Sequence, residues 1–159
     1  MKNPIPQGNY VPAIRTGDLI VTAGMTPRKD GVLIQKGKVM AGEPLETYEE
    51  AVRLAAQNAL TAAKNQLKGG EIIQQVLLMN VYVNAAPDFL QHPKLADFAS
   101  AYLLEELGTA GICARCALGM GTLPGDAPVE INLMAMAGPE PDSVDFGTSP
   151  YNRLRYELK

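Results

Sequence analysis

The run Ile72-Ile73-Gln74-Gln75-Val76-Leu77-Leu78-Met79-Asn80-Val81-Tyr82-Val83 (residues 72–83) is the longest strand-like segment of the chain. Apolar and β-branched residues dominate it, which is typical of a β-strand. Because side chains alternate along a strand, each face receives every second residue. One face is expected to carry Leu77, Met79, Val81 and Val83, and the other Val76, Leu78, Asn80 and Tyr82. Both faces are largely apolar, so each of them needs a covering layer.

Two helices are expected to flank this strand along the chain. The first covers residues 47–67, where Thr47 and Glu50 have the spacing of a capping box and Gly69-Gly70 supply a stop. Small side chains at helical spacing would let this helix pack closely on a sheet: Ala51, Ala55, Ala59 and Ala62. The second begins at Pro93 and ends before Gly108. Its inward residues are expected to be Leu95, Phe98, Ala99, Tyr102, Leu103 and Leu107.

Four further segments are predicted to be strands: residues 18–24, 31–39, 112–120 and 128–137, the first two forming a hairpin. The order β-β-α-β-α-β-β indicates an α+β sheet with both helices on one face. Two helices leave the other face uncovered, so the pattern favours oligomerisation through that face. From residue 138 onward the chain becomes rich in proline, glycine and acidic residues. We therefore expect a domain of residues 1–137 and a C-terminal extension of residues 138–159.

The composition excludes several classes of protein. The chain has 159 residues, the length of one domain, and 47% hydrophobic residues argue against a disordered chain. No run of 18 apolar residues could span a membrane, and no signal-peptide pattern opens the chain. A cytoplasmic protein is expected. The net charge of −3, with no Trp and three Phe, argues against a nucleic-acid partner.

Cysteine and histidine offer little chemistry. Cys113 and Cys116 form a Cys-x-x-Cys motif, but a zinc site needs four ligands and the chain has neither a second pair nor more than one histidine, His92. On a strand, residues three apart point to opposite faces, so the two sulfur atoms are expected to diverge. No metal site is predicted. His92, beside Pro93 at a helix start, is expected to be exposed or to cap the helix.

Two charged residues interrupt apolar strands and are the best candidates for a functional site. Arg115 lies in the strand at 112–120, and Glu130 lies in the strand at 128–137. A buried guanidinium is costly without an anion, and its planar fork matches a carboxylate. One interpretation is that Arg115 and Glu130 pair across two adjacent strands. The other is an anion pocket in which Arg115 binds a substrate carboxylate and Glu130, with a raised pKa, positions a water molecule.

A series of short motifs then follows in order through residues 7–137. The motifs are Gly8-Asn9-Tyr10-Val11-Pro12-Ala13, Leu19-Ile20-Val21-Thr22-Ala23-Gly24-Met25-Thr26-Pro27, Asn58-Ala59-Leu60, Val81-Tyr82-Val83, Asp88-Phe89, Gly111-Ile112-Cys113-Ala114-Arg115-Cys116-Ala117, Leu123-Pro124 and Pro128-Val129-Glu130-Ile131. The ordered series, rather than any one motif, resembles the RidA family (also called YjgF) of reactive-intermediate deaminases. The longer segment around residues 91–93 resembles a divergent branch of that family.

The resemblance implies a fold, an assembly and an activity. The fold is similar to that of chorismate mutase, and three subunits are expected to pack into a homotrimer with a central barrel and pockets at the subunit interfaces. The implied activity is the hydrolytic deamination of short-chain 2-imino acids or enamines to 2-keto acids and ammonia, without metal or cofactor. By resemblance, Arg115 binds the substrate carboxylate, Glu130 orients water, Tyr10 lines the pocket mouth and the backbone at Ala117 lies near the imine nitrogen.

The chain departs from the family pattern at four of the implied pocket positions. Ala23 and Met25 stand where Ser and Gln are usual, Asp97 where Asn is usual, and Ala117 where Cys is frequent. These changes thin the polar wall and add a carboxylate. Two alternatives therefore remain open: a related protein that binds another small carboxylate or catalyses another hydrolysis, and a non-enzymatic regulator. RNA as a target is disfavoured by the acidic net charge.

Overall fold

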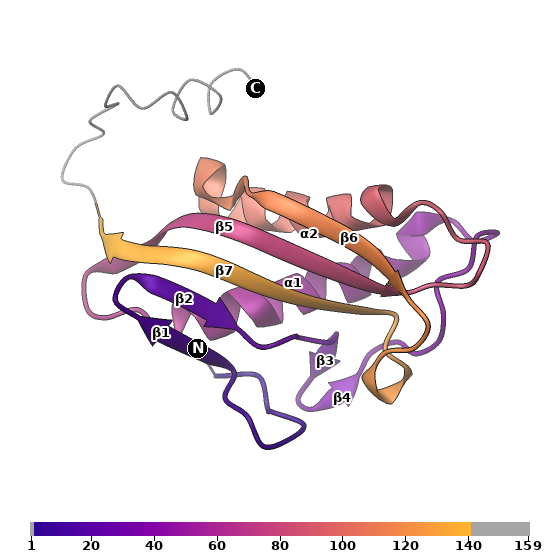
Figure 1. Cartoon of the computed structure of the whole chain (residues 1–159), viewed down its shortest axis with the longest axis horizontal. Coiled ribbons are helices and arrows are strands. Elements are labelled where there is room, and N and C mark those ends of the chain that lie inside the picture. Colours follow the sequence, from indigo (N-terminus) through magenta and orange to yellow (C-terminus); the bar gives the residue numbers. More distant parts are fainter. Residues whose placement is uncertain (1, 141–159) are drawn as a thin grey trace.

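A five-stranded sheet with two helices on one face forms the protein, as Figure 1 shows for the computed structural model, which describes residues 2–140. The strand order is β1-β2-β7-β5-β6, and only β5 and β6 pair in parallel. The strands are β1 Ala13–Thr16, β2 Leu19–Thr22, β5 Glu71–Asn84, β6 Ala114–Met120 and β7 Val129–Pro139. The α+β class predicted from the sequence, with both helices on one face, is confirmed.

The two helices are α1, Glu49–Lys64, and α2, His92–Leu107. The predicted alanine stripe of α1 is fully buried against the sheet, and Gly108, with a φ of 59°, ends α2 as expected. The predicted capping box is wrong. A 3₁₀ turn, Leu45–Tyr48, precedes α1, so Thr47 lies inside that turn and the residue before α1 is Tyr48.

The hairpin predicted at residues 31–39 is also wrong. The partner of β2 is β1, joined to it by a turn in which Gly17 has a φ of 58°. Only a two-residue strand, β4 Val32–Leu33, forms in the predicted segment, and it pairs with β3 Arg28–Lys29 in a separate small sheet. Gly31 and Gly37 have positive φ values and interrupt the extended backbone on both sides of β4.

The central strand β5 is longer and less regular than predicted. Met79, Val81 and Val83 lie on one face, as expected, and they are buried beneath the helices. Register shifts between Ile73 and Gln75 and between Val76 and Leu78 break the simple alternation. As a result Val76 is buried, whereas Leu77, predicted beside Met79, is 38% exposed. Each β-bulge inserts an extra residue into β5 and reverses the alternation before it, so Val76 changes face after one bulge and Ile73 returns to the face of Met79 after the second.

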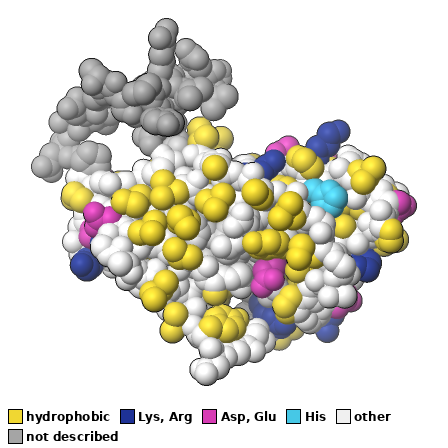
Figure 2. Space-filling model, viewed as in Figure 1, with side chains coloured by type: hydrophobic (Ala, Val, Ile, Leu, Met, Phe, Trp, Pro, Cys, Tyr) yellow, Lys and Arg dark blue, Asp and Glu magenta, His cyan; other side chains and the backbone are white. Residues whose placement is uncertain are grey.

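The sheet face away from the helices is apolar and uncovered in one chain. Figure 2 views this face and shows hydrophobic side chains gathered over the sheet. Among the larger ones, Ile14 of β1 and Leu118 and Met120 of β6 are exposed. No helix of the described residues is long and apolar enough to cross a membrane. The strand β7 runs to Pro139, and the rest of the predicted extension, residues 141–159, lies outside the described residues.

Candidate functional site

Arg115 lies on the helix-covered face of the edge strand β6. Its register partner on β5 is Met79, which is fully buried beneath the helices. The guanidinium reaches the side of α2. Nη1 donates to Asp97 Oδ1 at 2.9 Å and to Ser100 Oγ at 2.8 Å, and Nη2 donates to the carbonyl oxygen of Pro93 at 3.0 Å. These bonds hold a side chain that is 21% exposed in one orientation.

The same bonds leave part of the guanidinium available. An arginine carries five N–H donors, and within residues 2–140 three of them are used, two on Nη1 and one on Nη2 of Arg115. The Nε–H and one Nη2–H remain. These donors belong to Nε and Nη2, the two nitrogen atoms of the side-on edge of the fork, and this edge matches the two oxygen atoms of a carboxylate. Arg115 is therefore pre-oriented as an anion receptor.

Glu130 lies on the opposite face of the sheet. It is in register with Tyr82 on β5, whereas its neighbour Ile131 points into the core. A Cβ atom at Gly24 would be 2.6 Å from Glu130 Oε1, so the carboxylate lies directly against this glycine. Burial raises the pKa of the Glu130 carboxyl group. Within residues 2–140 no hydrogen bond or ion pair satisfies this carboxylate, and unpaired, half-buried acids of this kind are frequent at functional sites.

Removing the charge of Glu130 is expected to stabilise the fold at neutral pH. Because its folded-state pKa is raised, the wild type loses stability relative to Glu130→Gln as pH increases through that pKa. We expect the melting temperature of Glu130→Gln to exceed that of wild type by about 1–3 °C at pH 7 and by nothing near pH 4. Thermal melts at several pH values check this, with the surface change Glu46→Gln as control. A less stable Glu130→Gln at pH 7 would contradict the expectation.

Arg115 and Glu130 do not pair within one chain. Strand β5 lies between β6 and β7, and the two side chains lie on opposite faces of the sheet. The interpretation that they form an ion pair across adjacent strands is therefore wrong. Arg115 has a different carboxylate partner, Asp97, on α2.

The predicted residues instead form two groups. The Arg115 half-site comprises Arg115, Asp97, Ala117, Ser100 and the Pro93 carbonyl, with Ala117 on the same face of β6 as Arg115 because its register partner is the buried Val81. The Glu130 half-site comprises Ala23, Gly24, Met25 and Glu130, and the structure places Tyr10 with Gly24 and Met25 in a neighbouring pocket that Glu130 does not line. In this half-site Met25 is bonded to the backbone of Ile131, next to Glu130, and its side chain is buried.

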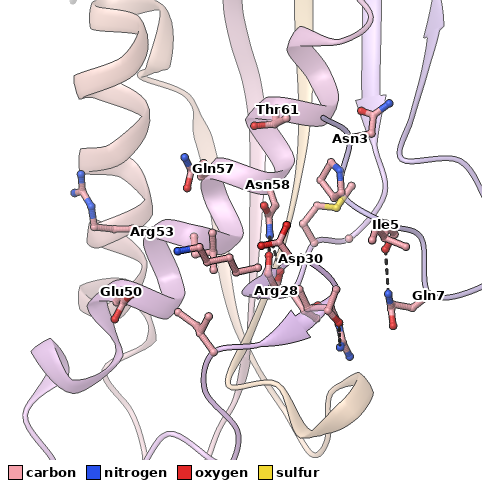
Figure 3. A pocket seen from close by; sticks show the side chains of 18 of the residues that line it. Asn3, Ile5, Gln7, Arg28, Asp30, Glu50, Arg53, Gln57, Asn58 and Thr61 are labelled. Atoms are coloured by element: carbon pink, nitrogen blue, oxygen red, sulfur yellow. Dashed lines mark hydrogen bonds between the residues drawn. The ribbon is translucent and has the colours of Figure 1, made fainter. Parts of the chain in front are cut away.

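A pocket of about 970 Å³ borders the Glu130 half-site. It lies between α1, the β3–β4 hairpin and the N-terminal segment, as Figure 3 shows. Tyr10, Gly24 and Met25 line it, and the Tyr10 hydroxyl accepts a hydrogen bond from the backbone N–H of Gln7. Neither Arg115 nor Glu130 lines this pocket, so within the described residues the pocket is separate from both charged groups.

The cysteine pair lies apart from this chemistry. Cys113 packs against the core, and burial raises the pKa of its thiol. Cys116 is exposed and in register with Asn80 on the open face, so the sulfur atoms diverge as predicted. A raised thiol pKa disfavours the reactive thiolate. Within residues 2–140 no cluster of three or more His, Cys, Asp or Glu could hold a metal ion.

Sequence reasoning missed three groups that build the site. Gly24 appears in the sequence as a strand terminator, but its missing side chain is what admits Glu130. Ser100 and the Pro93 carbonyl orient Arg115, and no sequence pattern marks them because their role follows from the docking of α2 on β6. The spacing Asp97-x-x-Ser100 on one helix face is the one signal that was present.

Comparisons with known proteins agree with this fold. The curated protein TCP17 of Trypanosoma cruzi is 28% identical over 130 residues, 81% of each chain. The crystal structure of Atu1372 from Agrobacterium tumefaciens, of unknown function, superposes with a TM-score of 0.74 at 30% identity over 87% of both chains. The YjgF protein of E. coli shares the fold, with a TM-score of 0.59 at 22% identity over 84% of this chain and 92% of its own.

A family model covers nearly all of the described residues. It matches residues 4–136 and is described as YjgF/chorismate mutase-like, with the word endoribonuclease added. The match includes both half-sites and both helices. The chain therefore belongs to the YjgF/chorismate mutase-like family, the RidA family that its motifs resemble.

Proposed function

We propose that the protein hydrolyses short-chain 2-imino acids, formed directly or from enamines, to 2-keto acids and ammonia. The observation that carries the proposal is the orientation of Arg115, whose side-on edge is left available by its bonds to α2. A carboxylate bound there would place the adjacent C=N carbon beside β6 at Ala117. The unpaired Glu130 supplies the second group that the reaction needs.

The chemistry requires one water molecule, both of whose protons pass to nitrogen. Glu130 accepts the first proton while the water oxygen bonds to the imine carbon and the C=N electron pair moves to nitrogen, and Glu130 then returns this proton to the nitrogen of the carbinolamine. The carbinolamine hydroxyl group gives its proton to the same carboxylate, which passes it to nitrogen; the C–N bond breaks, the keto group forms and ammonia leaves. The imine carbon is already electrophilic, so orientation of the carboxylate and one general base provide most of the catalysis. The proposal uses no metal ion or cofactor.

The two half-sites can serve one substrate only if they come from different copies of the chain. Arg115 and Glu130 lie on opposite faces of one sheet, so no small ligand bridges them within a chain. The uncovered edge of β6 and the apolar open face, which includes Leu118 and Met120, offer contact surfaces for another copy. We therefore place the site between neighbouring subunits of a homotrimer, with Arg115 from one subunit and Glu130 from the next.

Asp97 is expected to weaken substrate binding. Its carboxylate is 2.9 Å from Arg115 and 68% exposed, so it repels a substrate carboxylate through partly screened electrostatics. Asp97→Asn keeps an acceptor for Arg115 and removes the charge. We expect KM for a 2-imino acid to fall about 2- to 5-fold at low salt, and less at high salt. Asp88→Asn, an exposed charge outside the site, is the control, and an unchanged or higher KM for Asp97→Asn would contradict the expectation.

The test of the proposed function is a coupled assay. Threonine dehydratase generates 2-iminobutanoate, and its conversion to the keto acid is followed with and without the protein. Acceleration by wild type that is absent with Glu130→Gln supports the proposal. Equal rates with and without wild type would refute it and favour the alternative of a different small carboxylate, for which the apolar residues Ala23 and Met25 are the first features to examine. Incubation with RNA at low salt tests the activity named in the family description.

A further inference from the structure

His92, the first residue of α2, has a fixed position that the proposed reaction does not use. Its ring packs edge-on against the buried Phe89, with centroids 5.1 Å apart and an interplanar angle of 73°. A Cβ atom at Gly119 of β6 would be 2.5 Å from His92 Nε2, so the imidazole lies directly over the backbone of this glycine. The absence of a side chain at residue 119 is therefore what allows His92 to lie on β6.

His92 and Arg115 border the same strip of β6. Every second residue of β6 lies on one face, and the helix-covered face carries Arg115, Ala117 and Gly119. Their register partners on β5 are the buried Met79, Val81 and Val83. The Cα atoms of Arg115 and Gly119 are separated by about 13 Å at the usual rise of a strand. The two side chains are closer together than these Cα atoms, because the Arg115 side chain extends toward the start of α2. Its Nη2 donates a hydrogen bond to the carbonyl oxygen of Pro93, the residue next to His92. The guanidinium and the imidazole thus lie at the two ends of a strip whose centre is the small side chain of Ala117.

Both ring nitrogens of His92 are available to a ligand. Within residues 2–140 neither takes part in a hydrogen bond, and the side chain is partly exposed. A neutral imidazole offers one donor and one acceptor, so it can bond an amide or a hydroxyl group. A bound ligand that excludes water from these nitrogens without forming hydrogen bonds to them loses the free energy of their hydrogen bonds to water. Such a ligand therefore binds more weakly.

We infer that His92 is a second recognition group of the Arg115 half-site, and that the preferred substrates are 2-imino acids whose side chains end in a hydrogen-bonding group. The inference rests on the proposed function. The carboxylate binds the side-on edge of Arg115, the substrate side chain extends over Ala117, and its polar end bonds the imidazole. His92 sets specificity in this arrangement and takes no part in the proton transfers.

Two isosteric substrates test the inference. An amino-acid oxidase converts leucine and asparagine to 2-imino acids that end in an isopropyl and a carboxamide group, respectively. We expect wild type to have the higher kcat/KM for the carboxamide. His92→Leu is expected to lower this preference roughly 3- to 10-fold, the loss of one hydrogen bond, whereas His92→Gln retains a donor and keeps most of the preference.

Glycine variants provide a matched pair. Gly119→Ala leaves His92 in place but displaces its imidazole, so it is expected to lower the preference as His92→Leu does. Gly121→Ala is the control, because a Cβ atom there meets nothing within 4 Å. Since both changes act through the same ring, the double variant His92→Leu/Gly119→Ala is expected to be no worse than either single variant.

The outcomes separate this inference from the proposed function. Unchanged preference in His92→Leu and Gly119→Ala, with activity in wild type, overturns the role of His92 and leaves the proposed function intact. Inactive wild type overturns the proposed function. In that case calorimetric binding of the corresponding 2-keto acids, 2-oxosuccinamate and 4-methyl-2-oxopentanoate, decides on His92: a preference for the amide that His92→Leu abolishes supports its role, and equal binding refutes it.

Discussion

Arg115→Ala is expected to lower kcat/KM for 2-iminobutanoate by about 100-fold or more. The change removes both donors of the side-on edge, and a bidentate, charge-assisted contact is among the strongest that a protein makes with a carboxylate. Arg115→Lys keeps the charge but loses the fork, so we expect an intermediate loss of about tenfold. The coupled assay with threonine dehydratase measures both variants, and the loss is expected mainly in KM if the carboxylate is bound equally in the ground and transition states.

Two controls guard this result. Arg53→Ala removes an arginine of α1 of comparable exposure, 30% against 21%, that pairs with Glu105 and makes no contact with the Arg115 half-site, and it is expected to leave activity unchanged. Arg115→Ala also leaves Asp97 without its cation, so the double variant Arg115→Ala/Asp97→Asn tests whether the loss comes from that unpaired charge. Activity near wild type in Arg115→Ala would remove the anion receptor from the reaction.

The sequence predicted those elements whose signals are local. The helix that became α2 has Pro93 in its first turn and Gly108 after its end, and both act as expected. The alanine stripe of α1 indicates a short distance between this helix and the sheet, because small side chains let the two backbones approach each other closely. The two-sided apolar character of β5 also anticipated an uncovered sheet face, which the described residues display.

The errors arose where a contact between distant residues overrides a local pattern. The predicted capping box does not form, because a 3₁₀ turn that begins at Leu45 places Thr47 inside the turn rather than at the start of α1. The predicted face of Leu77 is wrong because β5 contains a bulge at this point. The bulge arises from the pairing of β5 with β7, which no local sequence pattern indicates. The hairpin partner of β2 was misassigned because β1 is short and resembles a loop.

In the candidate site too, local sequence patterns identify single residues, whereas contacts between distant residues decide how they are arranged. Arg115 and Glu130 were recognisable because each is a charge within an apolar strand. Their relation was not, since it depends on the strand order, in which β5 separates β6 from β7. Asp97 was noted as an added carboxylate, but its bond to Arg115 follows from how α2 docks on β6. A strand order cannot be derived from the residues of either strand alone.

Mixing two inactive variants is expected to restore activity. If each site combines Arg115 of one subunit with Glu130 of the next, then Arg115→Ala and Glu130→Gln subunits complement each other. Random assembly of equal amounts into closed trimers leaves both residues intact at about a quarter of the sites. The mixture, co-refolded or co-expressed, is expected to show about a quarter of wild-type activity, whereas each variant alone shows almost none.

A second mixture distinguishes the shared site from a site within one chain. Wild type is assembled with the double variant Arg115→Ala/Glu130→Gln in equal amounts. A site that draws on two subunits is intact at about a quarter of the positions, whereas a site within one chain is intact at about half of them. Because the two side chains lie on opposite faces of the sheet, the lower value is expected. A value of one half, together with no complementation between the single variants, would require Arg115 and Glu130 to act from one chain.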